Sequence, residues 1–408
     1  MSIISEIGRK HIRVRLFIYG MYALLITGAV SMVYPFLIMI AGTSKSGVDS
    51  PDARLVPQFL IEDVMFYRKN VEAFFDEQQT YMQSAYDLND KGFRNIIPLR
   101  QVNSRLVAHW NEFIKQQKLP FYAYAMAYSG YQVSKNIQPL LLRRFKDQLK
   151  TEFNNSITQL NQTLETDFIS WNNVFVRPNL YVQRRVTPGS SPYSIKWREF
   201  KMKQDPQYRI YANPDGFFRS IFLKAQYTND IAMYNKINQT HCSSWDNVIL
   251  TRRYPGKGYT DRQRKDWSDF VRSILNLYWI RADKQATPLF QTYLKAKYNN
   301  NINFLNRIYA AKYKFFKEIA LPEEIPLEGA VISDWDSFIQ GWKDPNTGTL
   351  HMLPDNMLRI HSIPLMFRDY MLKKFGSLAA ANKALGTRFT DIMQLNIPQR
   401  ECDQIFFK

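Results

Sequence analysis

Two pairs of carboxylates stand at a spacing that suits acid–base chemistry. Glu165 and Asp167 are separated by one residue, and Asp334 and Asp336 flank Trp335. Carboxyl groups held roughly 5–9 Å apart hydrolyse glycosidic bonds, one as general acid and the other as nucleophile or base. No feature of the sequence favours one pair over the other as catalytic. We expect Asp334 and Asp336 to form solvated edges beside a buried tryptophan. We therefore predict no enzymatic activity and assign no catalytic residue.

The sequence contains none of the short motifs that bind nucleotides or metals or activate a serine. PGKGYT lacks the GxxxxGK[ST] spacing, and neither HExxH nor GxSxG occurs. Cys242 and Cys402 show no CxxC spacing; two unpaired thiols are favoured, and a single disulfide stays open. We predict no cofactor and no metal site, and we expect each of the scattered histidines to be structural or at the surface: His11, His109, His241, His351 and His361.

Aromatic side chains are the best candidates for ligand contacts, since they make up 15% of the chain. Tryptophan and tyrosine faces stack on sugar rings, and the segments QRRVTPGSSPYS and RRYPGKGY mix arginine with tyrosine in what we expect to be exposed connections. A tryptophan that recurs at a fixed phase is more often a core residue than a ligand contact. The substrate-binding residues therefore stay unassigned.

The elements that must position these groups begin with a membrane anchor. Residues 16–44 carry no charge, and this run exceeds the roughly 20 residues that cross a bilayer. Arg9, Lys10, Arg13 and Arg15 precede it against Glu6 alone. By the positive-inside rule, residues 1–15 form a cytoplasmic tail and the bulk of the chain is extracytoplasmic. We predict a single-pass protein of the cell inner (plasma) membrane.

The charge of the chain points to anionic partners. The formal net charge is +18, and most of it follows the anchor. Such a charge attracts anionic lipid, nucleic acid or acidic glycans. Because basic residues outside the membrane do not meet chromosomal DNA, we expect anionic headgroups or an acidic polysaccharide as partner, and no nucleic acid.

The anchor also carries a family resemblance. YALLITGAVSMVYPFLIMIAGTSKS resembles the first helix of maltose-type (MalG-like) sugar permeases of ABC importers, on Tyr34-Pro35-Phe36 near the helix end and Thr43-Ser44-Lys45 after it. SGVDSPDARLVPQFLIEDVMFYRK resembles a subgroup with a large extracytoplasmic insertion after this helix. The match covers about residues 16–75, and the coupling loop and the other membrane helices of that family have no counterpart.

What the resemblance implies is a membrane component, the N-terminal portion, of an ABC-type carbohydrate import permease. Its implied partners are a second permease subunit, cytoplasmic ATPase subunits and a solute-binding protein, and the external domain would dock that binding protein or a glycan. The alternative is a stand-alone, membrane-anchored glycan-binding or glycoside-hydrolase-like protein. The identity of the sugar stays open.

The external part shows internal repeats. Four segments place an asparagine seven or eight residues after an aromatic, with separations of 74, 71 and 76 residues: Asn161, Asn235, Asn306 and Asn382. Trp171, Trp245 and Phe316 follow ten residues after the first three, and Phe389 follows seven residues after the fourth. A Trp-x-x-Phe then recurs at Trp197/Phe200, Trp267/Phe270 and Trp335/Phe338, with an earlier one, Trp110/Phe113, that we assign to a degenerate leading unit.

This phase decides how KKFGSLAAANKALGTRF is interpreted. The segment also resembles a permease coupling loop and a stretch of β-galactosidase-like glycosidases, but its in-phase partners favour the fourth copy of the repeat. Leu-x-x-x-Tyr and Trp-x-x-Phe each place two side chains on one helix face, which indicates helical hairpins. The fourth copy lacks its own Trp-x-x-Phe, so we expect it to be incomplete and the chain to be truncated.

The predicted fold class is mainly α: one transmembrane helix followed by degenerate helical-hairpin repeats of about 70–78 residues. The predicted parts are the tail 1–15, the transmembrane helix 16–44, a linker and degenerate first repeat 45–135, and the repeat domain 136–408 with units 140–213, 214–284, 285–358 and 359–408.

Overall fold

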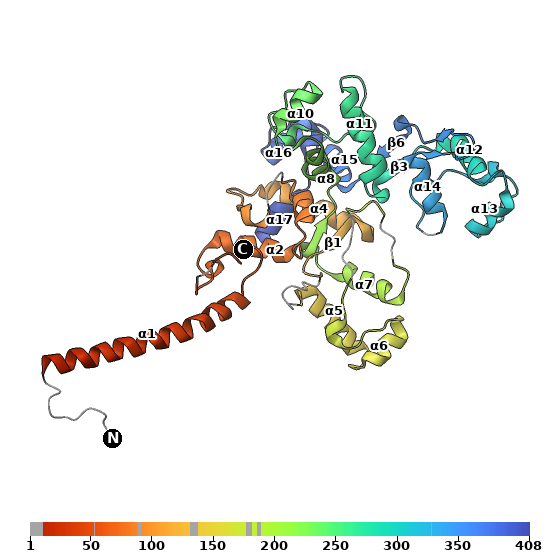
Figure 1. The fold of residues 1–408 in the computed structure, drawn as a ribbon. Coiled ribbons are helices and arrows are strands. Elements are labelled where there is room, and N and C mark those ends of the chain that lie inside the picture. Colours follow the sequence, from red (N-terminus) through yellow and green to blue (C-terminus); the bar gives the residue numbers. More distant parts are fainter. Residues whose placement is uncertain are drawn as a thin grey trace. The chain divides into compact units, whose positions relative to one another are not determined.

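The computed structural model confirms a mainly helical chain (Figure 1) and describes residues 11–52, 54–88, 92–130, 138–176, 182–185, 189–327 and 329–408. It divides into two compact units, Met1–Glu72 and Ala73–Lys408. In the described ranges the α-helices are α1 (Ile12–Thr43), α2 (Asp63–Phe74), α3 (Gln79–Tyr86), α4 (Ser104–Gln116), α5 (Leu140–Glu152), α6 (Ile157–Leu164), α7 (Pro192–Lys203), α8 (Pro214–Phe217), α9 (Lys224–Tyr227), α10 (Ile231–Asn238), α11 (Asp261–Asp269), α12 (Thr287–Lys297), α13 (Ile302–Tyr309), α14 (Val331–Gln340), α15 (Ile363–Phe375), α16 (Leu378–Leu385) and α17 (Gln399–Phe406).

Helix α1 is long and apolar enough to cross a membrane. Its 32 residues rise about 48 Å at about 1.5 Å per residue, against about 30 Å of bilayer hydrocarbon. It begins at Ile12, four residues before the predicted apolar run, because Arg13 and Arg15 are good helix formers and nothing there ends a helix. The predicted tail residues 1–10 lie outside the described residues.

The described residues form three small two-stranded antiparallel sheets, which the sequence analysis did not predict; two of them join distant parts of the chain, and the third is a local hairpin. Strand β1 (Tyr124–Met126) pairs with β2 (Arg209–Tyr211), β3 (Ile280–Ala282) with β6 (Leu358–Ile360), and β4 (Trp342–Lys343) with β5 (Leu350–His351). Except for β4 and β5, each strand lies shortly before the first helix of one predicted unit. The strands are too short to show the alternating apolar pattern that would predict them.

The same hydrogen-bonded turn follows each of four short helices, α6, α10, α13 and α16. In each, the recurring asparagine accepts at Oδ1 the backbone N–H of the residue seven positions on, and its Nδ2 donates to the carbonyl of that same residue. These bonds measure 2.8–3.1 Å, and we call the pair the Asn clamp: Asn161 with Phe168, Asn235 with Cys242, Asn306 with Tyr313 and Asn382 with Phe389.

The Asn clamp corrects the register of the fourth segment. A 3₁₀ turn begins at Trp171, Trp245, Phe316 and Ile392, ten residues after the respective asparagine in every case. Phe389 therefore occupies the clamped position of Phe168, and Ile392 takes the tryptophan position.

Three of the Trp-x-x-Phe motifs pack on the first helical stretch of the predicted unit to which they belong. Trp197 and Phe200 of α7 have ring centroids 5.0 and 5.1 Å from Phe145 of α5. Phe270, next to α11, lies 5.0 Å from Phe218, and Phe338 of α14 lies 5.3 Å from Phe290 of α12. The same contact thus recurs along the chain.

Helix α4 makes this contact for the fourth segment. Trp110 and Phe113 lie 5.1 and 5.4 Å from Phe367 of α15, and Asn103 Nδ2 donates to the Leu385 carbonyl at 3.1 Å. The position that we expected to be empty in the fourth segment is therefore filled by the helix that we assigned to a leading unit. The repeat architecture as a whole stays a prediction.

Candidate functional site

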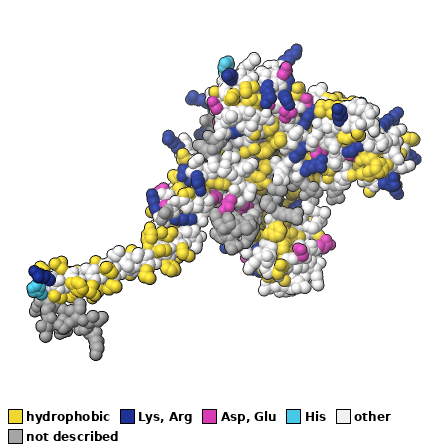
Figure 2. Space-filling model, in the orientation of Figure 1, with side chains coloured by type: hydrophobic (Ala, Val, Ile, Leu, Met, Phe, Trp, Pro, Cys, Tyr) yellow, Lys and Arg dark blue, Asp and Glu magenta, His cyan; other side chains and the backbone are white. Residues whose placement is uncertain are grey.

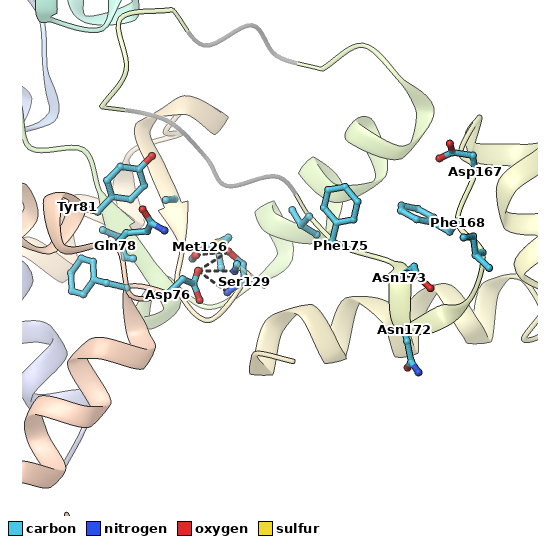
Figure 3. A pocket seen from close by; sticks show the side chains of 16 residues that line it. Asp76, Gln78, Tyr81, Met126, Ser129, Asp167, Phe168, Asn172, Asn173 and Phe175 are labelled. Atoms are coloured by element: carbon cyan, nitrogen blue, oxygen red, sulfur yellow. Dashed lines mark hydrogen bonds between the residues drawn. The ribbon is translucent and has the colours of Figure 1, made fainter. Parts of the chain in front are cut away.

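A cavity of about 570 Å³ opens within the unit Ala73–Lys408 (Figure 3). Asp76, Ser129 and Met126 lie on one side of it, and Phe168, Asn173 and Asp167 lie on the other. The cavity lies between the turn after α2, the β1–β2 pair and the loop after α6. Its full lining is Phe75, Asp76, Gln78, Tyr81, Ala125, Met126, Ser129, Gly130, Asp167, Phe168, Ile169, Asn172, Asn173, Phe175, Val176 and Ile210.

Asp76 is held at the cavity wall by backbone donors. Its Oδ2 accepts the N–H of Gly130 at 2.7 Å and the N–H of Ser129 at 3.2 Å. Asp76 and Glu77 both have positive φ, 50° and 64°, so a tight left-handed turn after α2 presents this carboxyl group. A Cβ on Gly130 would lie 3.0 Å from the Asp76 Oδ2, so a side chain there would press on this carboxyl group.

The second oxygen of Asp76 is the unusual one. Oδ1 is buried and accepts no hydrogen bond from any residue that the structure describes. Burial raises the pKa of Asp76 to about 8, against the lowering effect of the Gly130 and Ser129 donors. The neutral, protonated form of this carboxyl group is therefore favoured at pH 7.

We expect this acid to impose a pH dependence on stability. Above its ordinary pKa of 3.8 the unfolded state has released the proton that the folded state keeps up to about pH 8. The free energy of unfolding therefore falls as pH rises across that window, by at most about 1.4 kcal/mol per pH unit. Asp76→Asn should flatten the profile of midpoint against pH and should melt at a higher temperature than the wild type at pH 8.

Thermal melts of the full chain between pH 5 and 8 test this expectation. Asp167→Asn, on the facing wall and exposed, is the matched control and should keep the wild-type slope. Parallel profiles for the wild type and Asp76→Asn would contradict the assignment.

The facing wall combines aromatic rings with amides. The rings of Phe168 and Phe175 meet edge to face at 5.9 Å, and Phe175 is 47% exposed. Tyr193 supports both, since its ring lies 5.3 Å from Phe168 and its hydroxyl donates to the Phe175 carbonyl at 2.6 Å. Asn172 and Asn173 are exposed in the adjoining 3₁₀ turn. Rings and amides together offer stacking faces, donors and acceptors to one ligand.

The structure separates the two predicted carboxylate pairs. Asp167 lines the cavity, whereas Glu165 ends α6 in the left-handed conformation with φ 54° and does not line it. Asp334 and Asp336 are 2% and 0% exposed, so the expectation of solvated edges beside Trp335 was wrong.

Both buried aspartates are hydrogen-bonded to other side chains of the protein. Asp334 accepts from the hydroxyls of Tyr298 and Tyr309 and from Lys297, each at 2.6 Å. Residues two positions apart on a helix point in different directions, so Asp336 meets another set of partners, Arg184 among them, at 2.7 Å. Both carboxylates are buried and hydrogen-bonded to side chains of the same chain, so they serve the fold and not a substrate.

The remaining expectations have mixed outcomes. The segment QRRVTPGSSPYS is not wholly exposed, because Arg184 is only 12% exposed and bonds to Asp336, and its residues 186–188 lie outside the described residues. In RRYPGKGY, residues 253 and 256–258 are exposed. Cys242 and Cys402 are free thiols. In the ranges that the structure describes, no group of three or more His, Cys, Asp or Glu side chains is placed to hold a metal ion. Sequence reasoning missed Asp76, since FFDEQQ carries no motif.

Comparisons with known proteins add no neighbour. No family model, no curated protein and no solved structure matches the chain.

Proposed function

We propose that the chain is a membrane-anchored, carbohydrate-binding component of an ABC-type sugar import permease. The observation that carries this proposal is the cavity, whose walls combine exposed Phe175, the amides of Asn172 and Asn173, and the neutral carboxyl group of Asp76. Sugars present apolar C–H faces for stacking and hydroxyls that both donate and accept. The cavity offers complementary groups for each.

The permease setting rests on the resemblance of residues 16–75 and on α1. Arg13 and Arg15 stand at the N-terminal end of α1, and Arg9 and Lys10 precede them, which supports a cytoplasmic N-terminus in the inner (plasma) membrane. The proposed partners are a second permease subunit, cytoplasmic ATPase subunits and a solute-binding protein. Purification from native membranes is expected to recover an ATP-hydrolysing subunit with the chain, and recovery of the chain alone would contradict this setting.

Oligosaccharide binding tests the cavity. The full chain in nanodiscs of neutral lipid is titrated calorimetrically with a panel of neutral oligosaccharides. Phe175→Ala is expected to weaken binding roughly tenfold, because a lost stacking ring costs about 1–1.5 kcal/mol. Met202→Ala, which removes a 56% exposed apolar side chain of α7 outside the cavity, should bind as the wild type does. Equal affinities for Phe175→Ala and wild type would contradict binding in this cavity.

A second function, glycan cleavage by a stand-alone anchored protein, is favoured by one observation. Asp76 carries a proton at neutral pH, and Asp167 lies on the facing wall of the same cavity. Release of reducing sugar by the wild type that is abolished by Asp76→Asn and by Asp167→Asn would establish this function. Binding without release would leave the binding function in place.

A further inference from the structure

An exposed apolar surface lies on α13 and the loop that follows it. Phe304 and Ile308 are 43% and 39% exposed, and Phe315 is 67% exposed. Residues four apart share a helix face, so Phe304 and Ile308 project together while Leu305 is buried. Figure 2 shows apolar side chains among lysines and arginines over the region where Figure 1 places α12 and α13.

The charged side chains of residues 284–317 are all basic, and Glu318, whose carboxylate accepts the backbone N–H of Lys314, follows them. No aspartate or glutamate occurs between Asp283 and Glu318. Two cations of this stretch are paired, Lys284 with Glu323 and Lys297 with Asp334. The others are exposed and form no ion pair with any described residue: Lys295, Arg307, Lys312, Lys314 and Lys317.

The local fold does not demand these apolar residues. The Asn clamp aligns Asn306 with Asn161, and α6 has the same length as α13. At the positions equivalent to the three exposed apolar residues the first segment carries polar side chains. Gln159 stands for Phe304, Thr163 for Ile308 and Ser170 for Phe315. The second segment carries Met233 and Ile237, 44% and 46% exposed, in place of Phe304 and Ile308, but Ser244 in place of Phe315. The exposed ring of Phe315 therefore distinguishes α13 from both of these segments.

We propose that this surface is a second membrane contact that binds the anionic lipid headgroups of the leaflet facing the domain. We name it the α13 patch: Phe304, Arg307, Ile308, Lys312, Lys314, Phe315 and Lys317. Apolar side chains flanked by lysine and arginine match the boundary between headgroups and acyl chains, and each basic residue near an anionic surface contributes about 1 kcal/mol.

The membrane anchor α1 allows a contact of modest affinity between the α13 patch and the bilayer to be occupied. Helix α1 is long and apolar enough to hold the chain at a bilayer, so docking of the α13 patch is an intramolecular step at high effective concentration. The inference depends on α1 crossing the membrane and is independent of carbohydrate binding by the cavity.

Hydrogen exchange of the full chain in nanodiscs tests the contact. One set of discs contains phosphatidylcholine alone, and the other adds phosphatidylglycerol. Amides of residues 302–317 are expected to exchange severalfold more slowly in the anionic discs, and added salt should reverse this. Residues 157–172, the polar equivalent in the same molecule, should exchange equally in both.

Two variants separate the apolar and the charged contributions. One triple variant replaces the apolar residues by the side chains of the first segment: Phe304→Gln, Ile308→Thr and Phe315→Ser. The other removes three positive charges: Lys312→Gln, Lys314→Gln and Lys317→Gln. Each triple variant should lose the slowing in anionic discs, with residues 157–172 unchanged.

Two outcomes would overturn the proposal. One is equal exchange of residues 302–317 of the wild-type chain in both kinds of disc, a comparison that needs no variant to fold. The other is protection of these residues in neutral discs by a soluble acidic polysaccharide, without any effect of phosphatidylglycerol, which would assign the α13 patch to a glycan.

Discussion

Trp110→Ala is expected to lower the free energy of unfolding by about 4 kcal/mol, within the range for large aromatic residues in cores. Trp110 is 2% exposed, and its ring meets Tyr211 at 5.0 Å and Phe367 at 5.1 Å, edge to face in both cases. The substitution empties a cavity at the contact that joins α4 to α15. Urea denaturation of the detergent-solubilised chain, followed by circular dichroism, measures the change.

Two comparison variants test whether this loss of stability comes from the contact between α4 and α15. Trp267→Ala removes the equivalent, 1% exposed ring of α11 and should cost about as much. Trp171→Ala removes a partly exposed ring and should cost clearly less. If Trp110→Ala were no more costly than Trp171→Ala, the contact of α4 with α15 would not stabilise the fold.

Asp336→Asn is expected to cost about 3–4 kcal/mol, because breaking a buried ion pair leaves a charge without its partner. Asp336 is 0% exposed and lies 2.7 Å from Arg184 and 2.6 Å from Arg185. Arg184 is 12% exposed and also donates to the carbonyls of Val271 and Leu275, so it cannot turn out to water without breaking those bonds. The same denaturation experiment measures the loss.

A surface ion pair provides the matched control. Asp369 pairs with Arg252 at 2.7 Å, and both side chains are substantially exposed, so Asp369→Asn should cost less than about 1 kcal/mol. The double variant Arg184→Met with Asp336→Leu should regain much of the lost stability, since no charge is then left buried. Equal costs for Asp336→Asn and Asp369→Asn would show that the buried carboxylate is dispensable.

The sequence predicted the elements whose signal is local. The uncharged run of residues 16–44 indicated α1, and the evenly separated asparagines marked the positions of the four clamps. The register of the fourth segment was wrong, because the Asn clamp binds backbone atoms seven residues on. Phenylalanine, cysteine and tyrosine all occupy that position, so its side chain gives no signal.

Other features depend on contacts that sequence spacing does not reveal. The placement of α4 on α15 and the assembly of the cavity join residues far apart in the chain. One weaker signal was present. A polar residue follows the buried phenylalanine of each first helix and donates to carbonyls in or next to the 3₁₀ turn of the same segment: Lys146 to Asn172, Arg219 to Val248, Gln291 to Lys317 and Ile319, and Arg368 to Met393 and Leu395.

The contact between α4 and α15 sets an order of events during synthesis. His109 of α4 and Lys374 of α15 are 265 residues apart, and ribosomes add roughly 5–20 residues per second. Trp110 and Phe113 therefore emerge roughly 10–50 s before the helix that covers them. Through that interval their apolar face is open to wrong partners, including another nascent copy, and a holding chaperone would raise the yield of folded protein. Helix α4, made early, thus finds its place only after α15 has been synthesised.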